Sequence, residues 1–207
     1  MKTVQCGDYR TFKIIPIWFY KQEAFKYSST YWESKQSYNP VGGLSGLDDQ
    51  ETKLSTYWST SFKELCVGMK VGNDIEFLSI RYPASSLYDL IADGKYRATS
   101  LGRQKWKSLI SGSSLQRNCN KEGFNVAGTY KTNWAKARIG LIGNEQNECL
   151  SPDSYLGFGG LESANRRYFP DVNCGVTNVI NTCGNSATCT PDNGVKEIKA
   201  IGYIFVR

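Results

Sequence analysis

The chain has 207 residues, with 25 lysines and arginines against 19 aspartates and glutamates and no histidine, so its formal net charge at pH 7 is +6. This length is typical of one domain with a genuine hydrophobic core. No apolar run is long enough for a membrane span, the basic residues form no cluster that would favour nucleic acid, and the lack of histidine excludes Ser-His and Cys-His catalytic systems.

Strands are predicted in the first part of the chain. Residues 9–32 are rich in β-branched and aromatic side chains, which favour strands. Residues 38–49 contain the glycines, proline and asparagine that are typical of a loop. The segments 62–71 and 74–82 are predicted to form a strand pair, because a Gly-Asn dipeptide separates two strand-like runs.

Two short helices are predicted next. Ser86 and Asp89 have the spacing of a capping box, and Gly94 is placed to end the helix that follows. A second helix is expected within residues 102–112, where Gly112 closes it. The apolar stripes expected to pack into the core are Leu87, Leu90 and Ile91 in the first helix, and Trp106, Leu109 and Ile110 in the second.

The remainder is predicted to be rich in loops, with strands only at 137–143 and 196–207. The predicted fold class is therefore α+β, a mostly antiparallel sheet with short helices and long loops that disulfides and calcium would hold in place. We expect a single domain, residues 1–207. It would comprise an N-terminal subdomain at about 1–137 and a C-terminal ligand-binding region at about 138–207.

The chain contains seven cysteines, four of them in the last 59 residues. Because there is no histidine, and Cys183 and Cys189 are spaced too widely for a zinc knuckle, we favour disulfides over metal thiolates. Disulfides indicate a secreted, extracellular protein, whose signal peptide this sequence does not contain. The odd cysteine is expected to be Cys6. The disulfide candidates are Cys66, Cys119, Cys149, Cys174, Cys183 and Cys189.

Residues 143–160, GNEQNECLSPDSYLGFGG, combine amide and carboxylate side chains with four glycines. Between residues 138 and 175, five acids exceed three bases, which gives a local charge of −2 in a basic chain. Oxygen ligands on irregular backbone suit Ca²⁺, whereas transition metals are disfavoured without imidazole. The alternative is that these residues are simply turn formers on a solvated surface. The sequence contains no EF-hand loop.

A wider pattern extends from this stretch to the end of the chain, and it resembles the C-terminal part of the intelectins. These X-type lectins are related to the fibrinogen-like domains. The resemblance covers roughly residues 138–207. The matching motifs are Asn144-Glu145, Cys149, Gly157 to Gly160, Tyr168-Phe169-Pro170-Asp171, Cys174-Gly175 and Phe205-Val206-Arg207.

The resemblance implies a fibrinogen-like fold and a calcium-dependent glycan-binding site. The positions that match calcium ligands of the family are Asn144, Glu145, Asp153 and Asp171. The family has an acid where this chain has Val176, and its aromatic pair that flanks the sugar has no counterpart here. The aromatic residues that could contact a sugar instead are Tyr155, Phe158, Tyr168 and Phe169.

Three functions are compatible with these features. The leading hypothesis is a secreted calcium-dependent lectin that binds terminal vicinal diols of glycans and gains strength as a homo-oligomer. The alternative is an extracellular matrix or adhesion protein in which calcium only stiffens the loops. A glycosidase, which would need two carboxylates such as Glu145 and Asp171, is less favoured, so we expect no enzyme activity.

Overall fold

The computed structural model describes residues 14–17, 24–42, 49–129, 135–160 and 181–207. The strands are β1 (Ile14–Ile17), β2 (Phe62–Val71), β3 (Asp74–Ala84), β4 (Arg97–Ala98), β5 (Asn118–Ala127), β6 (Lys136–Asn144), β7 (Ser154–Gly160), β8 (Cys183–Ala187), β9 (Lys196–Lys199) and β10 (Ile201–Val206). The helices are η1 (Thr30–Trp32), α1 (Thr56–Ser59), α2 (Leu87–Ile91) and α3 (Arg103–Lys107). The prediction of mostly antiparallel sheet with a few short helices is confirmed at this level. Within these ranges, no helix combines the length and the apolar character needed to cross a bilayer.

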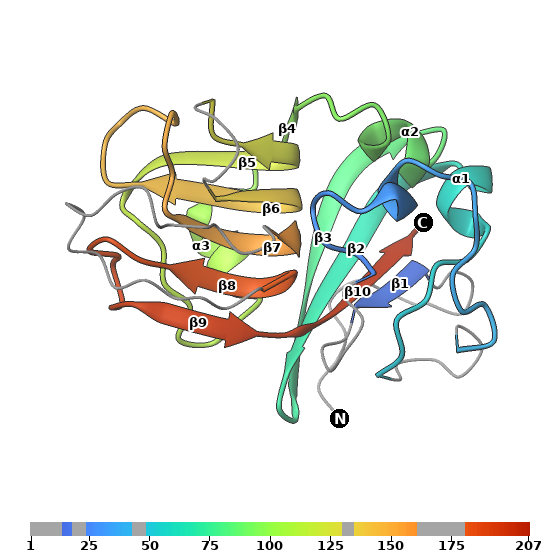
Figure 1. Ribbon diagram of the computed structural model, residues 1–207, viewed down its shortest axis with the longest axis horizontal. Helices are drawn as coiled ribbons and strands as arrows, with labels where there is room; N and C mark the ends of the chain where they lie inside the picture. The colour runs from blue at the N-terminus through green and yellow to red at the C-terminus, as the bar shows by residue number, and fades with distance from the viewer. Residues whose placement is uncertain (1–13, 18–23, 43–48, 130–134, 161–180) are drawn as a thin grey trace.

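The strands form two antiparallel sheets that share one hydrophobic core (Figure 1). One sheet has the strand order β1-β10-β2-β3, and the other has the order β4-β5-β6-β7-β8-β9. The core joins Leu65 and Ile80 of the four-stranded sheet to Leu141 and Leu156 of the six-stranded sheet. The strands of the two sheets run in clearly different directions, as in orthogonally packed sandwiches. The chain crosses between the sheets at the buried Ala200, which separates β9 from β10.

The local predictions in the middle of the chain are confirmed. β2 and β3 form the expected hairpin, and Gly72 in its turn has a φ of +59°. At α2 the Ser86 Oγ accepts a hydrogen bond from the Asp89 backbone N–H at 3.1 Å. The same hydroxyl donates to Asp89 Oδ2 at 2.8 Å, so the acid binds the hydroxyl of Ser86 in place of the backbone N–H that a capping box uses. The predicted apolar side chains are buried, but α3 ends at Lys107, so Leu109 and Ile110 follow the second helix and do not lie on it.

The structure corrects the prediction of a loop-rich C-terminal half. β5, β7 and β8 are regular strands in the centre of the six-stranded sheet, and the segment predicted as one strand at 196–207 is two strands in different sheets. The prediction for residues 9–32 is wrong in its second part. There, Phe25 and Trp32 pack edge to face at 5.6 Å in the core instead of forming a strand.

A row of four glycines explains why these strands looked like loops. Gly123 pairs with Gly140, Gly140 with Gly157, and Gly157 with Gly184, so the row crosses β5, β6, β7 and β8. A Cβ on Gly140 would lie 2.5 Å from the Leu156 carbonyl oxygen, and a Cβ on Gly157 would collide with a backbone carbonyl of β6. The glycines therefore mark close backbone approach inside a sheet.

Buried cations attach the N-terminal segments to the rest of the fold. Arg138 on β6 donates from Nε to the Tyr27 carbonyl at 2.8 Å and from Nη2 to Glu33 Oε1 at 3.0 Å. Lys53 is fully buried, and its Nζ donates to the carbonyl oxygens of Tyr31 at 2.5 Å and Ser34 at 2.6 Å. Burial lowers the pKa of Lys53 to about 8. These bonds satisfy charges that would otherwise be costly to bury.

We expect Gly140→Ala to lower the free energy of unfolding by about 3 kcal/mol, because backbone atoms of β7 block the new methyl group. This value is at the upper end of the range for substitutions that overpack a protein interior. The control is Gly72→Ala, where nothing lies within 4 Å of the new Cβ and φ is +59°. That change is expected to cost only about 1 kcal/mol, for the left-handed backbone. Urea unfolding measures both. Equal losses would contradict the steric role of the glycine row.

Candidate functional site

Antiparallel connectivity gathers four strand termini at one end of the six-stranded sheet, on the left in Figure 1. The starts of β5 and β7 lie beside the ends of β6 and β8, as the pairings Gly143–Ser154 and Ser154–Ala187 show. We call this region the polar end. It is defined by Gln116, Asn144, Glu145, Asp153 and Cys189.

Gln116 lies at the centre of the polar end and is fully buried. Its Nε2 donates to Glu145 Oε2, to the Cys189 carbonyl oxygen at 3.1 Å and to Asp153 Oδ2 at 3.4 Å. Its Oε1 accepts from the Asp153 backbone N–H at 2.9 Å. Asp153 is buried with it, whereas Glu145 is exposed. Three oxygens from separate segments thus converge on one amide nitrogen.

Asn144, the residue before Glu145, is buried as well. Its Nδ2 donates to the Glu148 carbonyl oxygen and to Glu148 Oε2, each at 3.0 Å. Its Oδ1 makes no hydrogen bond within the part of the chain that is described. A buried oxygen without a donor is costly and requires an explanation such as a water molecule or an ion.

Disulfides brace the same end of the sheet. Cys119 at the start of β5 is bonded to Cys149 in the loop after β6, with a Cα–Cα distance of 5.1 Å. Cys189, in a left-handed conformation with φ of 57°, is also disulfide-bonded, as is Cys66 on β2. The structure differs from expectation at Cys183, which is a free thiol. Cys183 is the first residue of β8 and is buried in the hydrophobic core, and this burial raises the pKa of its thiol.

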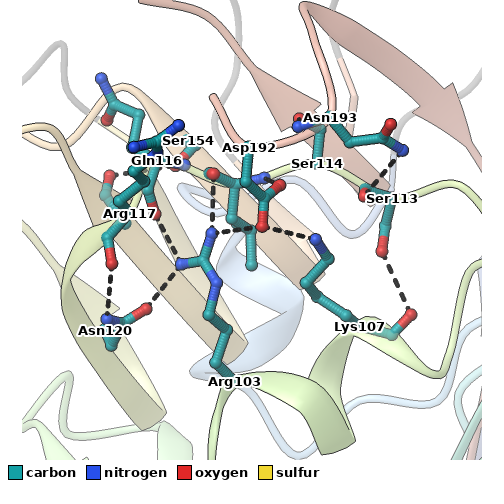
Figure 2. A network of polar contacts seen from close by, with 12 residues as sticks. Arg103, Lys107, Ser113, Ser114, Gln116, Arg117, Asn120, Ser154, Asp192 and Asn193 are labelled. Atoms are coloured by element: carbon teal, nitrogen blue, oxygen red, sulfur yellow. Dashed lines mark hydrogen bonds and ion pairs between the residues drawn. The ribbon is translucent and has the colours of Figure 1, made fainter. Parts of the chain in front are cut away.

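A carboxylate network lies next to the polar end (Figure 2). Asp192, in the loop between β8 and β9, accepts hydrogen bonds on Oδ2 from Arg103 Nη2 at 2.8 Å and from Lys107 Nζ at 2.6 Å. Its Oδ1 accepts from the Leu115 backbone N–H at 3.0 Å. Burial raises the pKa of Asp192, but the bonds from Lys107, Arg103 and Leu115 outweigh it and leave the pKa at about 2. Arg103 Nη1 also donates to the Gln116 carbonyl oxygen at 2.5 Å, which links the network to the polar end.

Glu122 forms a second buried carboxylate centre, on β5. Oε2 accepts from Trp106 Nε1 at 2.8 Å and from Thr99 Oγ1 at 2.6 Å, and Oε1 accepts from the Gly102 backbone N–H at 2.7 Å. Burial raises the pKa of the Glu122 carboxyl, yet these hydrogen bonds together leave it below its usual value. The centre fixes α3 and the loop before it, so its role is structural.

The predicted metal ligands Asn144, Glu145 and Asp153 do lie at one end of the sheet. Asp171 lies outside the described residues, as do the predicted Tyr168, Phe169 and Cys174. The part of the chain that the structure describes contains no group of three or more Asp, Glu, Cys or His side chains placed to hold a metal ion. The candidate donor set therefore depends on the Asn144 and Cys189 oxygens as well as on the two carboxylates.

The predicted sugar-contacting residues Tyr155 and Phe158 face inward, which corrects the prediction for both. Tyr155 is 4% exposed, and its hydroxyl donates to the Asn181 carbonyl oxygen. Phe158 is fully buried, and a Cβ on Gly202 would lie 2.8 Å from its ring. Both faces of β7 are buried, so the side chains of both aromatics pack inside the protein.

Gln116, Asp192 and Glu122 were missed by sequence reasoning. Each is a single polar residue in an irregular or strand segment, so no periodic pattern marks it. The one usable signal is at Gln116, which lies three residues before Cys119 and therefore close to the disulfide that closes the polar end. Comparison of the chain with protein-family models, curated proteins and solved structures gives no match.

We expect Asp192→Asn to lower the free energy of unfolding by about 1 kcal/mol at pH 6. The pKa of about 2 in place of 3.8 would give roughly twice this value in full, but solvent screens the exposed carboxylate. The carboxylate stabilises the fold above its ordinary pKa, and this contribution is lost as the pH falls from about 4 to 2. Urea unfolding at several pH values should therefore show wild type and variant converging in acid. Asp74→Asn, at an exposed site at the start of β3, is the control. A difference that does not depend on pH would contradict the ion-pair interpretation.

Proposed function

We propose that the protein is a secreted, calcium-dependent recognition module of the fibrinogen-like type, in which calcium at the polar end orders loops that bind carbohydrate. The observation that carries the proposal is the convergence of the Glu145 and Asp153 carboxylates on the Gln116 amide nitrogen. The residue before Glu145, Asn144, adds a buried Oδ1 that has no donor within the described residues. Two carboxylates, an amide oxygen and a backbone carbonyl are hard ligands of the kind that Ca²⁺ prefers.

The residues at the polar end offer the oxygen ligands that a calcium ion takes. Asn144, Glu145 and Asp153 would hold the ion, and the Cys189 carbonyl oxygen is within reach of the same amide nitrogen that contacts both carboxylates. Calcium, when bound, offers coordination positions that vicinal hydroxyls of a sugar can fill. Glu145 is exposed and belongs to the loop from residue 145 to residue 150, so we propose that this loop faces the ligand.

The disulfides support an extracellular setting. Cys119, Cys149, Cys66 and Cys189 are all oxidised, and such bonds persist mainly in secreted proteins. Weak binding at one site would be strengthened by multivalency, so we include a homo-oligomer in the proposal.

Calcium at 100 times its Kd is expected to raise the free energy of unfolding by about 2.7 kcal/mol, because an ion that binds only the folded state stabilises it. Thermal melts with calcium and with a chelator measure the effect. Asp153→Asn should abolish it, since the buried carboxylate is the ligand least able to be replaced by solvent. Asp74→Asn, at an exposed site on β3, should keep the full response. If the melting temperature of the wild-type protein is the same with calcium and with the chelator, the proposal is wrong.

A second function, a calcium-stabilised matrix or adhesion protein without sugar binding, is favoured by the burial of Tyr155 and Phe158. An aromatic face against the sugar ring is a usual part of such sites. A glycan array probed with and without calcium separates the two functions. The recognition module should bind a subset of glycans only with calcium. Calcium-dependent melting together with no glycan binding would support the structural protein instead.

A further inference from the structure

The amide nitrogen of Gln116 has more acceptors than hydrogens. Nε2 carries two hydrogens, but it lies within hydrogen-bond distance of Glu145 Oε2, of the Cys189 carbonyl oxygen at 3.1 Å and of Asp153 Oδ2 at 3.4 Å. Two of these oxygens come from the two ends of the β6–β7 loop, and the third comes from the segment after β8. Three oxygen ligands that converge on one positively polarised group resemble the environment of a bound cation.

The orientation of the amide is fixed by its other end. Gln116 Oε1 accepts from the Asp153 backbone N–H at 2.9 Å, so exchanging the amide oxygen and nitrogen would bring two donors together. The amide therefore cannot offer its oxygen to an ion by a simple flip. For a cation to reach the same oxygens, the amide nitrogen has to leave them.

The backbone of Gln116 is held in place while its side chain faces the oxygens. Its backbone N–H donates to Ser154 Oγ at 2.9 Å, and its carbonyl oxygen accepts from Arg103 Nη1 at 2.5 Å. Both partners belong to regular elements, β7 and α3. The movement needed to free the oxygens is thus confined to the side chain, and one of its three acceptors, Glu145, is exposed to solvent.

We propose that the Gln116 side-chain amide takes the place of the cation in the ion-free protein and is withdrawn when calcium binds, so that this residue sets the affinity of the site. The inference rests on the proposed function only for the identity of the ion. Gln116 keeps the two carboxylates paired in the absence of calcium, and it competes with calcium for the same oxygens.

The test is Gln116→Glu in the full chain, which keeps the acceptor for the Asp153 N–H but replaces the donor by an oxygen. Without calcium, the variant should melt at a temperature lower by about 5 °C, because three carboxylates then face one another. Isothermal titration with calcium should give a Kd at least tenfold lower than that of wild type, because the competing amide is gone and a ligand is added. The control, Gln104→Glu, makes the same charge change on the exposed surface of α3 and should leave the Kd within about twofold.

The outcomes separate this inference from the proposed function. If wild type binds calcium and Gln116→Glu binds it no more tightly, the inference is wrong and the proposed function stands. If only Gln116→Glu binds calcium, the amide does hold the cation position, but the natural protein is not calcium-dependent. If neither binds, both are wrong.

A second measurement covers the case in which Gln116→Glu does not fold. The side-chain amide resonances of Gln116 in ¹⁵N-labelled wild type, assigned by their loss in Gln116→Met, should shift strongly on calcium addition as their acceptors are lost. Resonances that stay in place while calcium binds would overturn the inference.

Discussion

The close approach of four backbones along the glycine row is the constraint on which the rest of the structure depends. A Cβ at Gly140 or Gly157 would collide with a carbonyl of the facing strand, so only one register brings glycine opposite glycine across β5 to β8. A slip by one residue would place side chains in that space and would turn each strand over. Because the register is fixed in the middle of the sheet, the residues that meet at its ends are fixed as well. The polar end is therefore a consequence of packing in the sheet centre.

Polar side chains with several hydrogen bonds hold the segments that the sheets do not; Glu122 and Arg138 are buried, and Asp192 is exposed. Glu122 fixes the approach to α3, Arg138 holds the N-terminal segment on β6, and Asp192 joins α3 to the loop after β8. Each makes several hydrogen bonds, which is the condition under which a charge can be buried without large cost. We predicted that disulfides and calcium would hold the loops. In the described residues, disulfides and these charged groups do so, and the calcium site remains a proposal.

The sequence predicted the elements that have local signals. The β2–β3 hairpin follows from two strand-like runs around a Gly-Asn turn, and α2 follows from the Ser86–Asp89 capping pair. Prediction from the sequence failed where the contact that determines the structure joins residues far apart in the chain. Gly157 and Gly184 look like turn residues until their cross-strand partners are known, and Tyr155 looks available until β7 is seen to be buried on both faces. For the site, residue types predicted the acids. Gln116 has only one local signal, its place near Cys119, because its side chain bonds residues far along the chain, such as Glu145 at a separation of 29.

An internal donor at the polar end also explains how the fold can form before any ion is bound. Two carboxylates at the end of a sheet repel each other unless a positive or positively polarised group lies between them. Gln116 supplies that group from within the chain, and the Cys119–Cys149 disulfide keeps the adjoining loop attached to β5 whether or not an ion is present. The change that we propose on calcium binding is limited to the Gln116 side chain and the loop from residue 145 to residue 150, and it leaves the glycine row and the core as they are. A change of the kind we propose, restricted to a surface loop on a sheet whose register is fixed, would let the protein respond to an ion without unfolding.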